Sequence, residues 1–285
     1  MRFGFGSNWQ AYAKHVDVAA IAEAERSQVE MLGRDSLRGK RFLDIGSGSG
    51  LFSLAAVRLG AERVHSFDYD SDSVACTRSI KDRFAPDAGA WTIERGDVLD
   101  DGYMRALGSW DVVYSWGVLH HTGDLWRALA NVTKLVRPNG RLYIALYNDQ
   151  GVVSRFWLAV KRLYVGSGRW IQKLMEIVFF AGFAGILFAL DLVRLRNPRQ
   201  RHDGTARRGM TLYTDVVDWI GGYPFEVARC ADVVTFMENC GFAIERLIDV
   251  GCLRNGCNEF VFVRADQPAG EMKMPHPQSS QPAFS

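Results

Sequence analysis

A glycine-rich loop between two apolar segments constrains the fold of this chain more than any other feature. The first segment, residues 41–45, is apolar except for Arg41 and Asp44, and the loop Gly46-Ser47-Gly48-Ser49-Gly50 follows it. An apolar helical pattern then covers residues 51–59, and a second short run at 63–67 ends at Asp68. This order of strand, glycine turn, helix and strand predicts one unit of a parallel α/β sheet.

The same loop predicts a binding site for a nucleoside cofactor. Glycines let the backbone approach a ligand closely, and the start of the next helix offers unpaired N–H groups. Asp68 closes the second strand, where a carboxylate can accept hydrogen bonds from ribose hydroxyls. The spacing is G-x-G-x-G rather than the G-x-G-x-x-G of dinucleotide sites. Asp44 would repel a pyrophosphate but could hold an amino group, so the sequence favours an amino-bearing cofactor without phosphate.

Further segments follow in a recognisable order. Residues 93–100 predict a third strand that runs into Asp97, and residues 109–119 predict an apolar fourth strand. Residues 130–148 predict a helix that stops at Pro138-Asn139-Gly140 and then a fifth strand. Together with the glycine loop, residues 40–148 resemble the class I S-adenosylmethionine (SAM)-dependent methyltransferases. The Leu-Val-Arg-Pro-Asn-Gly-Arg-Leu turn at 135–142 is most similar to the ubiquinone/menaquinone type.

The resemblance implies an α/β fold with a Rossmann-like, seven-stranded, mostly parallel sheet flanked by helices. It also implies an N-terminal helical cap and, in this chain, a helical insertion after the fifth strand. The implied divisions are a cap at 1–39, a SAM-binding core at 40–149, a basic and apolar insertion or lid at 150–225, and the C-terminal part of the core at 226–264. The proline-, glutamine- and serine-rich residues 265–285 predict a disordered tail.

The resemblance also implies residues that bind SAM, whose product is S-adenosylhomocysteine. Asp68 would bind the ribose, the ring of Tyr69 would lie along the adenine, and Asp97 would meet the adenine amino group. The end of the fourth strand would pass under the methionine part of the cofactor. The full implied set is Asp44, Gly46, Ser47, Gly48, Gly50, Asp68, Tyr69, Asp97, Val98, Ser115 and Trp116.

Candidate catalytic residues follow the fourth strand. His120 and His121 lie where the methyl group should point, and a histidine suits removal of a proton from an oxygen acceptor. His120 is nearer the strand end and is the favoured base, although one or both histidines could instead orient the loop. Candidate substrate contacts are Trp9 and Tyr12 in the cap, with Tyr147 and Asn148 after the fifth strand.

Composition and missing motifs narrow the chemistry. The net charge of +2 gives no sign of nucleic-acid binding, and the five cysteines form no C-x-x-C pair, so we expect neither a nucleic-acid partner nor a metal site. The Asn/Asp-Pro-Pro-aromatic run of base-amine methyltransferases is absent at 115–118. The expected reaction is O-methylation of a small apolar, phenolic, quinol or lipid-like acceptor. Alternatives are another SAM-using reaction or a catalytically silent SAM-binding partner subunit.

The insertion carries the most unusual composition. Residues 177–190 are fourteen consecutive residues without a charge, and residues 155–208 hold eleven lysines and arginines against three acids. A helix at 170–195 could be a lid over the acceptor, a peripheral contact of residues 150–210 with an anionic membrane, or a packed interface of a homodimer. The N-terminus lacks the pattern of a signal peptide, so we expect a cytoplasmic protein, or one peripheral on the inner face of the membrane.

Overall fold

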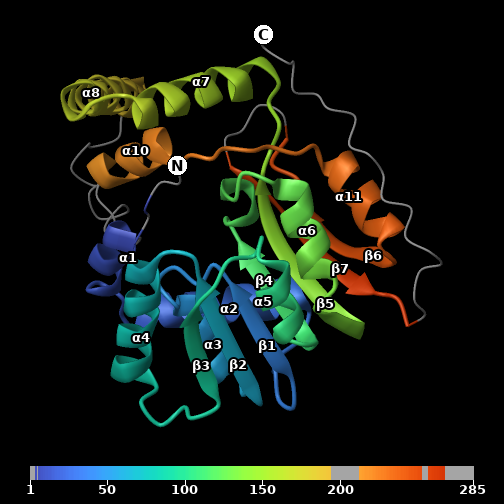
Figure 1. The fold of residues 1–285 in the computed structure, drawn as a ribbon. Helices are drawn as coiled ribbons and strands as arrows, with labels where there is room; N and C mark the ends of the chain where they lie inside the picture. Colours follow the sequence, from blue (N-terminus) through green and yellow to red (C-terminus); the bar gives the residue numbers. More distant parts are fainter. Residues whose placement is uncertain (1–3, 5, 194–211, 252–255, 267–285) are drawn as a thin grey trace.

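A seven-stranded sheet forms the centre of the molecule (Figure 1). The structure is a computed structural model that describes residues 4, 6–193, 212–251 and 256–266. The strand order is β3-β2-β1-β4-β5-β7-β6; the first five strands run parallel, and β7 is antiparallel to both of its neighbours. The strands are β1 Arg41–Ile45, β2 Arg63–Asp68, β3 Trp91–Arg95, β4 Trp110–Trp116, β5 Val136–Tyr147, β6 Phe242–Ile248 and β7 Cys257–Arg264. The predicted fold class is confirmed.

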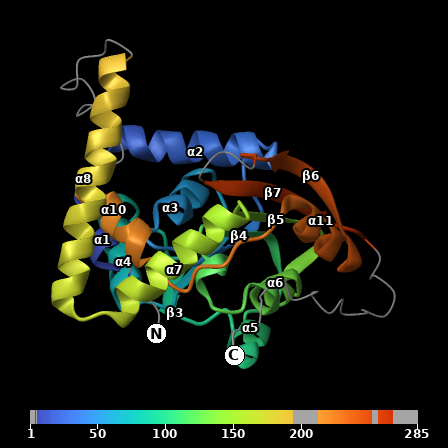
Figure 2. The same ribbon diagram turned by 90° about the horizontal axis from the view of Figure 1, so that it is seen from above.

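Helices cover both faces of this sheet (Figure 2). On one face lie α2 (Val18–Leu32), α3 (Leu51–Arg58) and α4 (Ser71–Phe84), and on the other lie α5 (Asp101–Ala106), α6 (Leu125–Thr133) and α11 (Cys230–Asn239). Neighbouring residues of one strand serve opposite faces: Phe42 packs with the first layer and Leu43 with the second, and both are fully buried. This double burial explains why the parallel strands read as continuous apolar runs.

The topology brings the predicted site residues together. β1 and β4 are neighbours although two strands separate them in the sequence, so their following loops diverge to opposite sides of the sheet. Ligands of open α/β sheets bind outside the carboxyl ends of the strands at such a switch point. The helix α1 (Gly6–Ala13) lies against α4 beside this edge, and the Gly6 N–H donates to Asp70 at 2.9 Å.

Three further helices lie above the same edge of the sheet. They are α7 (Val152–Gly166), α8 (Arg169–Val193) and α10 (Leu212–Gly221), all from the region predicted as an insertion (Figure 1). They share a small core of their own, in which Val160, Tyr164 and Ile220 are buried. We call α7 and α8 together the arm.

Two boundaries differ from the sequence prediction. The helix expected to stop at Pro138-Asn139-Gly140 already ends at Thr133, because the Trp110 N–H donates to the carbonyl of Leu135 at 2.7 Å and draws the following residues into the sheet. The third strand ends at Arg95 rather than at Asp97. Most of the tail predicted to be disordered, 267–285, lies outside the described residues.

Candidate functional site

A cavity of about 420 Å³ opens at the carboxyl ends of the parallel strands. Its volume is in the range of small-molecule sites. One half, which we call the cofactor half, is formed by the loops after β1, β2 and β3 and includes Gly46, Asp68, Tyr69, Asp97 and Val98. The other, which we call the acceptor half, is formed by the end of β4 and the loop after it, the end of β5, and α10 with the residues that follow it. It includes Trp116, His121, Tyr147, Asp218, Trp219 and Tyr223.

The glycine loop is fixed to the end of β2. The backbone N–H of Gly48 donates to Oδ2 of Asp68 at 3.0 Å, and Oδ1 of Asp68 accepts from the Asp70 N–H at 2.9 Å. Gly48 has a φ of 52°, and a Cβ at this position would lie 2.9 Å from the Trp9 ring. Residue 48 must therefore be glycine for the cap helix α1 to lie over the loop.

The cofactor half presents carboxylates and aromatic surface. Burial raises the pKa of Asp68 to about 6, against the opposing effect of the backbone N–H groups of Gly48, Tyr69 and Asp70. Asp97 accepts from the Leu99 N–H at 2.9 Å, and the half-exposed Tyr69 ring lies 5.5 Å from the Arg95 guanidinium. These carboxylates can accept hydrogen bonds from the hydroxyl and amino groups of a nucleoside, and their charge would repel a phosphate.

Five predicted cofactor residues do not line the cavity: Gly48, described above, and Asp44, Ser47, Gly50 and Ser115. Asp44 is buried and accepts a hydrogen bond from the Ser53 hydroxyl, and its burial raises its pKa to about 7. Ser47 pairs with the Thr77 hydroxyl at 2.9 Å, Ser115 donates to the Ile45 carbonyl at 3.0 Å, and Gly50 caps the start of α3. These residues hold the loop and strand ends that line the cavity; direct contact with a cofactor remains a prediction for them.

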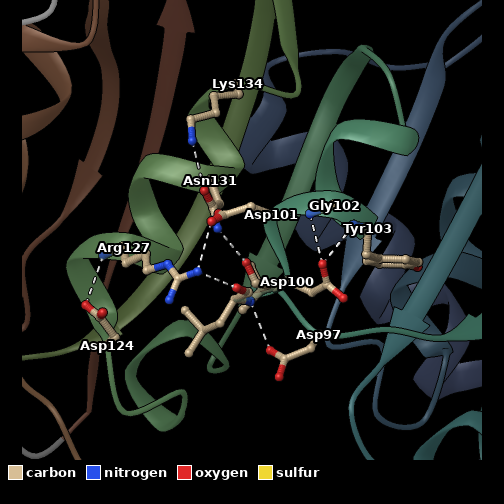
Figure 3. A network of polar contacts seen from close by, with 11 residues as sticks. Asp97, Asp100, Asp101, Gly102, Tyr103, Asp124, Arg127, Asn131 and Lys134 are labelled. Carbon is tan, nitrogen blue, oxygen red and sulfur yellow. Dashed lines mark hydrogen bonds and ion pairs between the residues drawn. The ribbon is translucent and has the colours of Figure 1, made fainter.

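A polar network positions the loop that carries Asp97 and Val98 (Figure 3). Asn131 of α6 is buried and donates to the Val98 carbonyl at 3.0 Å, while Lys134 donates to the Asn131 side-chain oxygen at 3.0 Å. Arg127 donates to the Leu99 carbonyl at 3.0 Å and pairs with Asp101. The network therefore ties the side of the cavity that carries Asp97 and Val98 to α6.

Replacing Asn131 by leucine should lower the free energy of unfolding by about 1–3 kcal/mol, because the change leaves the buried carbonyl of Val98 without its donor. Urea unfolding monitored by circular dichroism measures this loss. The control is Arg127→Leu, which also removes a donor to the loop but from a half-exposed side chain, and should cost less than about 1 kcal/mol. Equal losses in the two variants would contradict the special role of Asn131.

The two adjacent histidines have different surroundings. His121 lines the cavity, and its Nδ1 lies 2.6 Å from the Pro224 carbonyl, which can only accept. Nδ1 therefore carries the proton and Nε2 is the acceptor nitrogen, as a general base requires. Burial lowers the pKa of His121 to about 4, so the ring is neutral at pH 7.

His120 lies beneath the wall rather than in it. Its ring is fully buried, Nδ1 accepts from the Tyr147 N–H at 3.2 Å, and the two rings are 3.9 Å apart. Among the described residues Nε2 has no hydrogen-bond partner. The sequence favoured His120 as the base, whereas this placement favours His121 and gives His120 the task of supporting Tyr147.

Only two of the four predicted substrate contacts line the cavity. Trp9 and Tyr147 line the cavity, whereas Tyr12 packs edge-on against Trp9 with the ring centroids 6.0 Å apart. The Asn148 amide donates to the Gly251 carbonyl at 2.8 Å and accepts from Asn258 at 3.1 Å, so its contacts join two loops. Substrate binding by any of the four remains a prediction.

The sequence reading missed the contribution of α10. Asp218, Trp219 and Tyr223 line the acceptor half, and Asn8 of the cap donates to Asp218. Beneath them Lys161 is buried, donates to the Trp219 carbonyl, and lies 4.6 Å and 4.8 Å from the Trp219 and Phe225 ring centroids. Burial lowers the pKa of Lys161 to about 7 and raises that of Asp218 to about 7. Three aromatic residues within residues 219–225, Trp219, Tyr223 and Phe225, were the feature of the sequence that could have indicated this part of the cavity.

Comparison with known proteins agrees with this geometry. Residues 43–142 match a family model described as a methyltransferase domain. The ubiquinone biosynthesis O-methyltransferase of Rhizobium rhizogenes is 33% identical over 124 residues, which cover 42% of this chain and 48% of that protein. A highly reducing polyketide synthase of a Fusarium species is 29% identical over 167 residues, 51% of this chain and 6% of that protein. The matches thus span less than half of the length of these relatives.

Solved structures show the same fold. The magnesium protoporphyrin IX methyltransferase of Synechocystis PCC 6803, crystallised with SAM, aligns over 86% of this chain and 79% of that chain, with a TM-score of 0.51 and 14% identity. The [4+2]-cyclase SpnF aligns over 85% of this chain and 80% of that chain, with a TM-score of 0.51 and 11% identity. Residues 43–142 therefore match a methyltransferase domain, and the chain has the Rossmann-like fold of class I SAM-dependent methyltransferases.

Proposed function

We propose that this protein transfers the methyl group of SAM to an oxygen of a small, largely apolar acceptor. The observation that carries the proposal is the single cavity in which Asp68 and Asp97 face one half and His121 faces the other. SAM supplies an electrophilic methyl group, and the protein has to align the acceptor with it in a site that excludes water. Alignment of this kind is worth up to about 7–11 kcal/mol of the barrier.

The acceptor half favours a flat, apolar molecule with one hydroxyl group. Its walls are largely aromatic, with Asp218 and His121 as polar groups among them, and the ring centroids of Tyr147 and Trp219 lie 5.8 Å apart. Nε2 of His121 would take the hydroxyl proton as the acceptor oxygen attacks. Bound SAM would supply the methyl group and leave as S-adenosylhomocysteine, with the carbon–sulfur bond broken. Phenols and quinols fit this description, and the ubiquinone biosynthesis O-methyltransferase relative supports the oxygen acceptor.

Two alternatives keep the same cofactor. The fold neighbour named as a [4+2]-cyclase shows that this architecture serves more than one reaction, so the cavity could use SAM in another way. The chain could also be a silent SAM-binding subunit. The test is to incubate the purified protein with SAM and a panel of catechols, phenols and hydroquinones and to measure S-adenosylhomocysteine and methylated product. Binding of SAM without product from any acceptor would contradict the proposal.

Replacing Asp68 by alanine should weaken SAM binding by about 1–3 kcal/mol, because ribose hydroxyls would lose a partly buried hydrogen-bond acceptor. Isothermal titration calorimetry with SAM, and with NAD as a ligand that should not bind, measures the effect. The control is Asp111→Ala at the opposite end of β4, where the carboxylate pairs with Arg137. Unchanged affinity in Asp68→Ala would remove Asp68 from the cofactor site.

A further inference from the structure

The helix α8 is apolar on two opposite faces. On its inner face Phe179 and Phe183 pack against Trp157 of α7, with ring centroids 5.8 Å and 6.3 Å away. On its outer face apolar side chains at helical spacing are 55–91% exposed; they are Trp170, Leu174, Ile177, Val178 and Phe188. A helix that is apolar all round belongs in a protein core or in contact with lipid. Packing within this chain explains the apolar residues of the inner face of α8 but not those of the outer face.

The first helix of the arm adds to the same open surface. Val152, Phe156 and Leu163 are 55–69% exposed, and their spacing of four and seven residues places them on one side of α7. Figure 1 shows α7 and α8 above the sheet, and Figure 2 shows α7 crossing it while α8 runs along one side of the molecule. The arm thus exposes apolar side chains along both of its helices, an unusual arrangement for a surface that faces only water.

The exposed charges of the arm have one sign. Arg155, Arg162, Arg169 and Lys173 are exposed. The two acids of residues 152–191 are covered: Asp191 is buried, and the Glu176 carboxylate accepts hydrogen bonds from Tyr164, Lys173 and Tyr213. The outward surface of the arm is therefore apolar and positive. A second copy of this chain would bring two positive surfaces together, whereas an anionic lipid surface complements both properties.

We infer that the arm docks on the surface of an anionic lipid bilayer, with α7 and α8 lying in the plane of the interface. Within the described residues, Arg169–Asp191 is long and apolar enough to span a membrane, and very little of its apolar part is buried. The inner face nevertheless holds the helix along the protein: Trp157 contacts both Phe179 and Trp219, with ring centroids 5.8 Å and 5.3 Å away. Crossing the bilayer would pull these contacts apart.

Docking in this orientation would place the acceptor half beside the lipid. Trp219 joins the arm to the cavity, since it contacts Trp157 of α7 and Tyr147 of the cavity wall. If the proposed function holds, an apolar acceptor could pass from the bilayer to the cavity along this side. The docking itself does not require methyl transfer, so binding to vesicles and turnover can fail independently.

Co-sedimentation of the full chain with vesicles tests the inference. Binding to vesicles of equal parts phosphatidylglycerol and phosphatidylcholine should be at least tenfold stronger than to phosphatidylcholine alone, and 0.5 M NaCl should reduce it. The variant Leu174→Ser/Ile177→Ser/Phe188→Ser should lose at least tenfold in binding. Arg155→Gln/Arg162→Gln should lose about 30-fold, since each basic residue near the surface is worth about 1 kcal/mol.

A matched control separates the arm from general surface hydrophobicity. Ile244 and Leu247 of β6 are 37% and 41% exposed, and Ile244→Ser/Leu247→Ser should bind vesicles like the parent protein. Thermal unfolding confirms that each variant is folded. The inference is overturned if the control loses binding equally, if neither lipid binds, or if alkaline carbonate fails to extract the bound protein. A dimer in analytical ultracentrifugation that the arm variant abolishes would also overturn it.

Discussion

Replacing His121 by alanine should lower kcat by about 100-fold or more, because the acceptor hydroxyl would lose the base that takes its proton. Affinity for SAM should change little, since His121 lies in the acceptor half of the cavity. Steady-state kinetics with a phenolic acceptor and calorimetry with SAM measure the two quantities. A general base contributes to the chemical step, so the loss should fall on kcat more than on KM.

A second variant separates the chemical role from the structural one. His121→Asn keeps an N–H near the position of Nδ1, where it can donate to the Pro224 carbonyl, but offers no basic nitrogen. It should therefore fold like the parent and lose as much activity as His121→Ala. His120→Ala, by contrast, removes the ring beneath Tyr147 and should affect stability and KM more than kcat. Full activity in His121→Asn would show that alignment alone suffices.

The pH dependence of kcat/KM gives an independent test of the same residue. Protonated His121 cannot accept a proton, so activity should rise with pH as the ring becomes neutral. Because burial lowers its pKa to about 4 in the free enzyme, this rise should be centred near pH 4 and complete by about pH 6. A rise centred near pH 6.5, the value for an exposed histidine, would contradict the buried placement.

The cofactor half was largely predictable because the residues that form it lie close together in the sequence. The apolar run, the glycines and the acid of residues 41–68 lie within one strand–helix–strand unit, and a parallel sheet brings the carboxyl ends of its strands to one edge. Asp68 and Asp97 were therefore predictable as neighbours of one cavity, although β3 ends two residues before Asp97. Asp44, unlike Asp68 and Asp97, does not line the cavity, because its strand places it against Ser53 of α3.

The acceptor half could not be predicted in the same way. His120 and His121 are adjacent in a single 3₁₀ turn, Leu119–His121, and no periodic pattern distinguishes which ring faces the cavity. Asp218 and Trp219 come from α10, about a hundred residues later, and reach the cavity through packing between aromatic side chains such as Trp157 and Trp219. Long-range packing of this kind leaves no local signal in the sequence.

Replacing Gly46 by alanine should weaken SAM binding by at least about 100-fold, or about 2.7 kcal/mol. Gly46 lines the cofactor half with a φ of 77°, and a Cβ there would lie 2.9 Å from the Val118 Cβ and closer still to its methyl groups. Val118 also lines the cavity and is stiff because it is β-branched, so it cannot turn aside cheaply. The glycine loop or Val118 must shift, and either movement changes the shape of the cavity.

The matched control is Gly108→Ala. Gly108 has a nearly equal φ of 70°, but a Cβ there meets no atom within 4 Å, and the residue does not line the cavity. Both variants should lose about 1–2 kcal/mol of stability from the left-handed backbone, and Gly46→Ala somewhat more from the collision. Only Gly46→Ala should lose SAM affinity, measured by calorimetry below the unfolding transition of each variant. If the two variants bound SAM equally well, close approach at Gly46 would play no part in cofactor binding.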